Sequence, residues 1–252
     1  PPPTPAHSPP RGRTLTPPPP PSATQTRTPP PPDAQTEPDT IRPQAVPRDG
    51  ATREGTVSVE VPAYLADVVA TFSHLARSSN HVNQRSGVSV RLSVANYEAL
   101  AANALRRGLR AGERSIVARV DDLDALAASS MGKIEIESLE EGREGAIMDN
   151  LIKGAVLTVF KETVPPEQTR AVVDAFEDGA VAHTGEGVSS AELAVLIEQV
   201  EPLRAPVAVL AGGDESPAAV GAAVGFVLEG LHLSKRLNKD ASGASATYRG
   251  RT

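Results

Sequence analysis

Cysteine and tryptophan are absent from the 252 residues, and tyrosine and phenylalanine occur only three and four times. Without cysteine the chain forms neither disulfides nor thiolate metal sites, which is typical of proteins in a reducing compartment. No apolar run approaches the ~20 residues that a membrane-spanning helix needs. The N-terminus also lacks the basic and then apolar pattern of a secretory signal. These absences predict a soluble, cytoplasmic protein whose core consists mainly of Ala, Val, Leu and Ile.

Basic residues are fewer than acidic ones: 25 Lys and Arg against 31 Asp and Glu, which gives a net charge of −6. This balance argues against a protein that coats nucleic acid non-specifically, although a local basic patch is compatible with it. We therefore expect neither a membrane nor a nucleic acid as partner.

Proline is abundant but unevenly placed: eighteen of the 24 prolines lie in the first 50 residues, with runs at 17–21 and 29–32. Proline fixes φ and lacks the amide hydrogen, so such a stretch forms neither a helix interior nor a sheet ladder. We predict that residues 1–55 are a disordered tail with polyproline II character. Three interpretations stay open: a solvated tail, a docking arm for SH3- or WW-type domains, or translation from a misplaced start codon.

From residue 56 onward the apolar residues recur with helical spacing. The pattern predicts a mostly α fold of six or seven helices with one small β-hairpin, in which 134–137 forms a short strand or hairpin arm. We expect a helical domain at 56–165, a C-terminal helical extension at 166–240 and a disordered end at 241–252. The predicted helices start at Pro62, at an N-cap Ser93, at Asp121 or Asp122, near Ala146, at Glu167, at Ser189 or Ser190, and at Ser216-Pro217. The helix from Glu167 is expected to end at Val181. The stretch 204–215 is predicted to be a loop.

The motif that grips phosphate in many ATPases, G-x-x-x-x-G-K-[ST], is absent. Gly132-Lys133 comes nearest, but Ala127 stands at the upstream glycine position and Ile134 replaces the hydroxyl residue. No apolar strand ends in the paired acids that hold magnesium. The chain alone is therefore not expected to hydrolyse ATP.

Other catalytic patterns are missing as well. There is no H-E-x-x-H pair and no G-x-S-x-G elbow, and Asp121, Asp122 and Asp124 are explained by helix capping. We predict no catalytic residue and no metal site. The five histidines are scattered and are expected at the surface: His7, His74, His81, His183 and His232.

Arginine is the residue type that points to a ligand. A planar guanidinium suits phosphate oxygens because it offers forked donors and stays charged. For most of these arginines, solvated helix faces and pairs with Glu98, Glu113 or Asp122 are the simpler explanation. Eight of them crowd between 77 and 119: Arg77, Arg85, Arg91, Arg106, Arg107, Arg110, Arg114 and Arg119.

Several short motifs follow one another along the chain. Residues 77–91 read R-S-S-N-H-V-N-Q-R-S-G-V-S-V-R. Further segments are N-Y-E-A-L-A-A-N-A-L-R-R at 96–107, R-V-D-D-L at 119–123, M-G-K-I-E-I-E at 131–137, L-I-K-G-A-V-L-T-V-F at 151–160 and L-E-G-L-H-L-S-K-R-L-N-K-D at 228–240. Their order resembles the lid domain of magnesium-chelatase ATPase subunits and their MoxR-type relatives, which are AAA+ ATPases and in which S-G-V-S-x-R carries the sensor-2 arginine. The resemblance covers about 57–240.

By this resemblance Arg91 is the sensor-2 arginine, which reaches the γ-phosphate of ATP bound on the core domain. Arg85 and Gln84 are weaker candidates for the same surface. The alternative for Arg91 is a salt bridge to the chain's own helices. The resemblance also implies ATP and magnesium as cofactors of a complete AAA+ core, ring-forming copies as partners and, in some relatives, a partner with an integrin-like domain.

The chain departs from the family where the core domain should precede Val57, because a proline tract stands there instead. Our first hypothesis is the lid and C-terminal part of a truncated or split chelatase-like ATPase, without activity alone. The alternative is a non-enzymatic helical interaction or regulatory protein with a proline-rich docking arm. A DNA-binding regulator that uses the arginine-rich 77–119 region is a third class.

Overall fold

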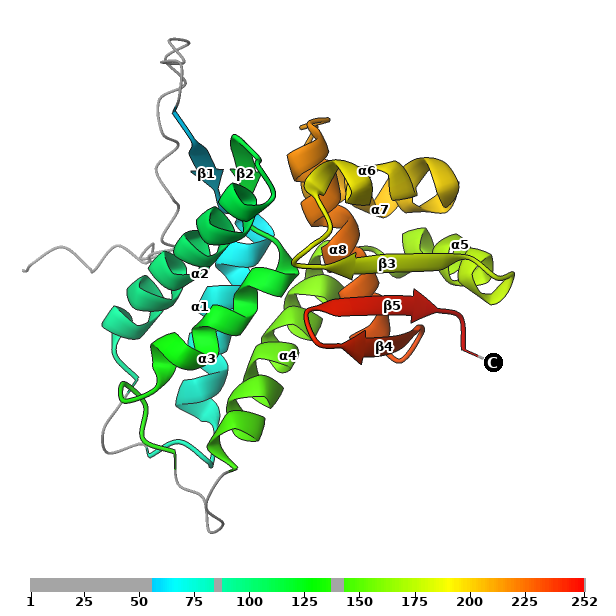
Figure 1. Ribbon diagram of the computed structural model, residues 1–252. Coiled ribbons are helices and arrows are strands. Elements are labelled where there is room, and N and C mark those ends of the chain that lie inside the picture. Colours follow the sequence, from blue (N-terminus) through cyan, green and yellow to red (C-terminus); the bar gives the residue numbers. More distant parts are fainter. Residues whose placement is uncertain (1–55, 84–87, 137–142, 252) are drawn as a thin grey trace, which may run out of the picture. The chain divides into compact units, whose positions relative to one another are not determined.

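The computed structural model describes residues 56–83, 88–136 and 143–251, which belong to one compact unit (Figure 1). The fold is mostly helical, as predicted, with two small sheets. The elements are, in order, β1 (Ser58–Glu60), α1 (Ala63–Ser78), α2 (Val90–Arg110), β2 (Ser115–Val117), a 3₁₀ turn (Val120–Asp124), α3 (Ala125–Ser130), α4 (Glu144–Thr163), α5 (Pro166–Glu177), β3 (Val181–Gly185), α6 (Ser190–Gln199), a 3₁₀ turn (Glu201–Leu203), α7 (Arg204–Ala211), α8 (Pro217–Leu233), β4 (Asn238–Ser242) and β5 (Ser245–Arg249).

Helix α8 lies at the centre of the core. Its N-cap Ser216 accepts a hydrogen bond from the Ala219 amide at 3.3 Å, and Pro217 occupies the first helical position. Every residue from Val220 to Leu231 is buried, so the helix is covered on all sides, by α4, α6 and α7 among others. Gly221 allows α6 to approach α8 closely, since a Cβ there would lie 2.5 Å from the Ser190 carbonyl oxygen.

The predicted boundary at 165/166 does not separate two cores in the described residues. Helix α1 packs on α2 and α4, and the Tyr64 ring of α1 lies 4.6 Å from the Phe226 ring of α8. Phe160 of α4 meets the same Phe226 ring edge-on at 6.3 Å. One continuous apolar cluster therefore extends from α1 to β5.

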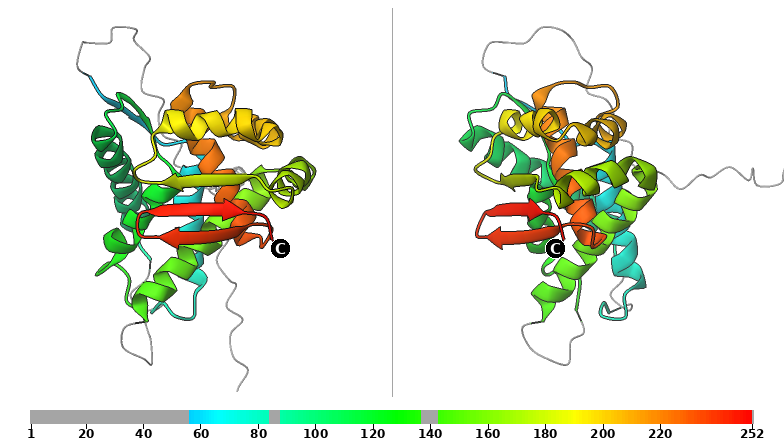
Figure 2. Two further views of the ribbon diagram at one scale, coloured as in Figure 1. Left: turned by 45° about the vertical axis from the view of Figure 1, so that its right-hand side comes forward. Right: turned by 90° about the vertical axis from the view of Figure 1, so that its right-hand side faces the viewer.

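Two sheets flank the helices. Strands β1 and β2 form a parallel pair in which Val59 lies opposite Ile116. Strands β3, β5 and β4 form an antiparallel sheet in that order, which crosses in front of α8 in the left view of Figure 2. Tyr248 of β5 joins this three-stranded sheet to α8, because its hydroxyl donates a hydrogen bond to Glu229 Oε2 at 2.5 Å.

Several local predictions are wrong. Helix α2 begins at Val90 with Ser89 as N-cap, one turn earlier than the predicted Ser93. The predicted loop at 204–215 contains α7, whose Val207 and Leu210 are buried against neighbouring helices. The predicted hairpin arm at 134–137 is reduced, within the described residues, to isolated bridges at Ile134 and Ile136.

The C-terminal prediction also needs correction. Helix α5 ends at Glu177 and not at Val181, because Val181–Gly185 pairs with β5 as a strand. The end expected to be disordered from 241 forms the rest of β4 and all of β5. Ala246 and Tyr248 are buried there, and this tertiary burial orders a segment whose local sequence favours disorder. The predicted tail at 1–55 lies outside the described residues.

Candidate functional site

Arg91 stands in the first turn of α2 with its side chain exposed. Its backbone amide donates to the Oγ of the N-cap Ser89 at 3.1 Å. The first turn of α2 contains no acidic residue, and the Arg91 guanidinium forms no ion pair with the described residues. The guanidinium and the positive end of the helix dipole are thus presented together to anything that approaches this end.

Contacts with α1 fix the start of α2. Arg77 Nε donates to the Val88 carbonyl oxygen at 3.1 Å, just before the N-cap. Ser93 Oγ donates to Ser73 Oγ at 2.8 Å, and Ser73 in turn donates to the Val69 carbonyl oxygen at 3.1 Å. Helix α1 therefore holds the backbone both before and after Arg91. The weaker candidates Gln84 and Arg85 lie outside the described residues.

Apolar side chains flank Arg91. Val90 is 65% exposed and Val94 is 45% exposed, both high values for β-branched apolar residues. The two valines give the surface around Arg91 an apolar part that a covering polypeptide would remove from water.

A second cluster of charges lies buried at the other end of α2. Arg107, which is 3% exposed, donates from Nε and Nη2 to the Asp122 carboxylate at 3.0–3.2 Å. The same guanidinium donates to the Val117 carbonyl oxygen at 2.8 Å and lies 3.4 Å from Glu113 Oε2. Glu113 also accepts the Ser190 amide at 2.7 Å, so the cluster ties α2 to the start of α6.

Arg119 completes this buried cluster. Its side chain is fully buried, Nη1 donates to the Val188 carbonyl oxygen at 2.8 Å, and neither Nε nor Nη2 has a hydrogen-bond partner in the described part of the chain. Burial lowers the pKa of Arg119, and the nearby Arg107 lowers it further. Burial also raises the pKa of the neighbouring Asp121, an effect that the Arg119 charge opposes. The cluster is closed to ligands and fixes the joint between α2 and the loop before α6.

We expected most of these arginines to lie on solvated helix faces or to pair with Glu98, Glu113 or Asp122. Arg106, Arg110 and Arg114 are exposed, and Arg107 pairs with Glu113 and Asp122. The burial of Arg107 was not expected, and the prediction is wrong for Arg119, whose buried side chain donates to the Val188 carbonyl oxygen. A signal for Arg107 was present, because it continues the buried face of Leu100 and Ala104 at helical spacing. The capping interpretation holds for Asp122, which accepts the Arg119 amide at 2.8 Å, although its carboxylate also neutralises Arg107.

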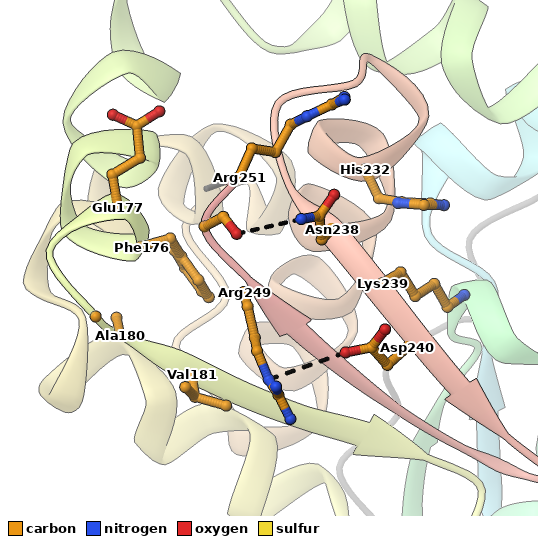
Figure 3. A pocket seen from close by; sticks show the side chains of 12 residues that line it. Phe176, Glu177, Ala180, Val181, His232, Asn238, Lys239, Asp240, Arg249 and Arg251 are labelled. Atoms are coloured by element: carbon orange, nitrogen blue, oxygen red, sulfur yellow. Dashed lines mark hydrogen bonds and ion pairs between the residues drawn. The ribbon is translucent and has the colours of Figure 1, made fainter.

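A hollow beside the three-stranded sheet has a volume of about 490 Å³. Its cations do not converge on a common point: Figure 3 shows the side chains of Arg249 and Arg251 pointing away from each other. Lys239 Nζ is bound to Glu229 Oε2 at 2.7 Å, and Arg251 Nη1 donates to the Lys235 carbonyl oxygen at 2.8 Å. This hollow has no set of side chains arranged for catalysis.

Metal ligands are likewise not gathered at any point of the described chain: no group of three or more His, Asp or Glu side chains is placed to hold an ion. His74, His81 and His183 are exposed, and the Nδ1 of the half-buried His232 lies 3.3 Å from the Leu237 carbonyl oxygen. None of the described helices combines the length and apolar character needed to cross a bilayer.

Comparison with known proteins gives no match: no protein-family model, no curated protein and no solved structure is significantly similar to the chain.

Proposed function

We propose that the chain is the lid-type, C-terminal part of an AAA+ ATPase of the magnesium-chelatase kind, and that it supplies Arg91 to a nucleotide held by another domain or polypeptide. The observation that carries this proposal is the exposed Arg91 in the first turn of α2, between the exposed Val90 and Val94. The order of motifs from 77 to 240 supports the same family.

The chemistry explains why such a residue works only in a complex. In water, solvent and salt screen the attraction between one guanidinium and a phosphate. When a partner surface covers Val90 and Val94, water is excluded and the guanidinium stabilises negative charge far more strongly. Phosphoryl transfer also needs a phosphate-gripping loop and magnesium, which the core would hold. In this scheme the chain closes over ATP, contacts neighbouring ring subunits and does not hydrolyse ATP alone.

The partner set follows from the same proposal. Copies of a complete family ATPase would form the ring, and a protein with an integrin-like domain is a further candidate partner. What the ring remodels is a property of those partners and not of the residues described here.

A complementation assay tests the proposal. The acceptor is the core domain of a magnesium-chelatase ATPase that keeps its phosphate loop and lacks its own lid. We expect no ATP turnover from the chain alone, turnover when the chain is added to the core, and a loss of about 10²–10³-fold with Arg91→Ala, the usual cost of removing one donor to a developing charge. Arg91→Lys keeps the positive charge but loses the forked donors that bind two phosphate oxygens at once, so partial activity is expected.

Arg110→Ala is the matched control, because Arg110 is also exposed on α2 but lies about five turns further along. Full turnover with Arg91→Ala, or turnover by the chain alone that Arg91→Ala removes, would contradict the proposal.

A second candidate function, a non-enzymatic interaction protein, is favoured by the apolar residues that α2 exposes far from Arg91, such as Leu109 at 55%. This candidate predicts binding to a complete family ATPase that does not depend on nucleotide and survives Arg91→Ala.

A further inference from the structure

One face of α2 remains uncovered along most of the helix. The opposite face packs on α1 and α3, and the helix also contacts β1 and β2. The uncovered face is apolar in large part, although α2 lies at the surface, and helical spacing places its members in one band. We refer to this band as the α2 stripe: Ala95, Glu98, Ala102, Arg106 and Leu109.

The charges of the α2 stripe are complementary but out of each other's reach. Glu98 and Arg106 are separated by eight residues, about 12 Å along a helix axis, so they cannot pair within one helix. Glu98 is exposed and forms no ion pair with any other described residue. The Arg106 guanidinium donates only to the neighbouring Asn103 side chain. Each charge is thus available to a second molecule.

The arrangement is self-complementary about Ala102. Glu98 and Arg106 lie four residues before and after Ala102, and the small Ala95 and large Leu109 lie seven before and after it. A two-fold axis through Ala102 would set Glu98 opposite Arg106 of the second copy and Leu109 opposite Ala95 of the second copy, twice each. A small residue on the axis lets two helices approach closely, and an isologous contact satisfies both copies at once.

We propose that two copies of this chain associate through an antiparallel contact of their α2 stripes, centred on Ala102. The occupant is a second copy because both the charges and the side-chain sizes match under the same symmetry operation. One helix pair covers less surface than the ~1,600 Å² of a standard interface, so the dimer is weak and depends on concentration. Val90 and Arg91 lie beyond the centre of the contact, and the inference is independent of the proposed function.

Sedimentation velocity of the full chain across the micromolar range is the first test. We expect the mass to rise from 26.2 kDa toward twice that value. Glu98→Arg and Arg106→Glu each place like charges opposite one another and should weaken association at least tenfold. The double variant restores opposite charges and should recover the wild-type association. Glu198→Arg, on the exposed surface of α6, is the matched control and should change nothing.

Cross-linking tests the position of the axis. The chain has no cysteine, so Ala102→Cys introduces a single thiol. Only a residue on the two-fold axis meets its own copy within the 4.4–6.8 Å Cα separation of a disulfide. We expect a disulfide dimer on mild oxidation, and far less with Ala205→Cys, an exposed control position on α7.

A monomer at every concentration would overturn the proposal and leave the α2 stripe to a different partner. So would a dimer that is indifferent to Glu98→Arg, or a double variant that stays monomeric while its circular dichroism matches the wild type. Equal cross-linking at positions 102 and 205 would also overturn it.

Discussion

Helices α8 and α2 are both long and both begin at a serine N-cap, yet they occupy opposite situations. Every residue of α8 from Val220 to Leu231 is buried, including Glu229, which accepts a hydrogen bond from Tyr248 and pairs with Lys239. Helix α2 buries one face through Leu92, Leu100 and Ala104 and exposes the other.

The difference separates stability from recognition. A helix covered on all sides, like α8, contributes apolar burial and has no surface left to offer a partner. A helix covered on one side can carry a ligand-binding or docking residue on the other at little cost to the fold. The candidate residue Arg91 and the α2 stripe both lie on the exposed side of α2, which is why substitutions there are expected to affect binding and not folding.

The largest expected effect comes from the centre of α8. Phe226→Ala removes a fully buried ring that contacts Tyr64 and Phe160, and we expect the free energy of unfolding to fall by about 3–5 kcal/mol. Leu109→Ala on α2, at 55% exposure, should lower it by less than about 0.5 kcal/mol at concentrations where the chain is monomeric. Urea denaturation measures both values.

Similar losses in these two variants would mean that α2 is covered in solution by something that the described residues do not provide. Helix α2 would then be as fully covered in solution as α8.

The buried face of α2 should behave like α8. Asp122→Ala leaves the Arg107 guanidinium buried without its carboxylate, and an uncompensated buried charge costs about 3–5 kcal/mol. The exposed face offers the control: the Arg110–Glu186 pair spans 3.7 Å between side chains that are 67% and 47% exposed. Glu186→Ala should therefore cost less than about 1 kcal/mol. Equal costs for the two carboxylates, measured by the same denaturation, would show that burial does not distinguish the two faces.

The sequence was sufficient for elements that carry their own signals. The start of α8 is marked by Ser216-Pro217 and that of α6 by Ser189, and both are N-caps in the structure. It was insufficient for α7 and for the strands β3, β4 and β5. These segments have five to eight residues each, and their order comes from contacts with distant parts of the chain, as between Tyr248 and Glu229.

The candidate site divides in the same way. Arg91 could be singled out because the motif that surrounds it is local. For the Arg107–Asp122 pair, the sequence offered Asp122 as one of three possible partners of the clustered arginines, but it did not show that this pair would be buried. The exposed α2 stripe is visible only when the packing of the opposite face is known.

The smallest expected effect uses the feature that the two helices share. Ser89→Ala and Ser216→Ala each remove the side-chain oxygen that accepts a first-turn amide, from Arg91 in α2 and from Ala219 in α8, and a lost N-cap costs about 1 kcal/mol. In α2 the first turn is largely exposed, so the loss should appear as faster amide exchange confined to the first turn, without a matching fall in global stability. In α8 fraying would uncover the buried Ala218 and Val220, so the loss should appear in global unfolding. Local fraying in both variants would mean that burial does not hold the start of α8. The two helices would then have first turns that open equally easily, and the turn around Arg91 would not differ from that of α8.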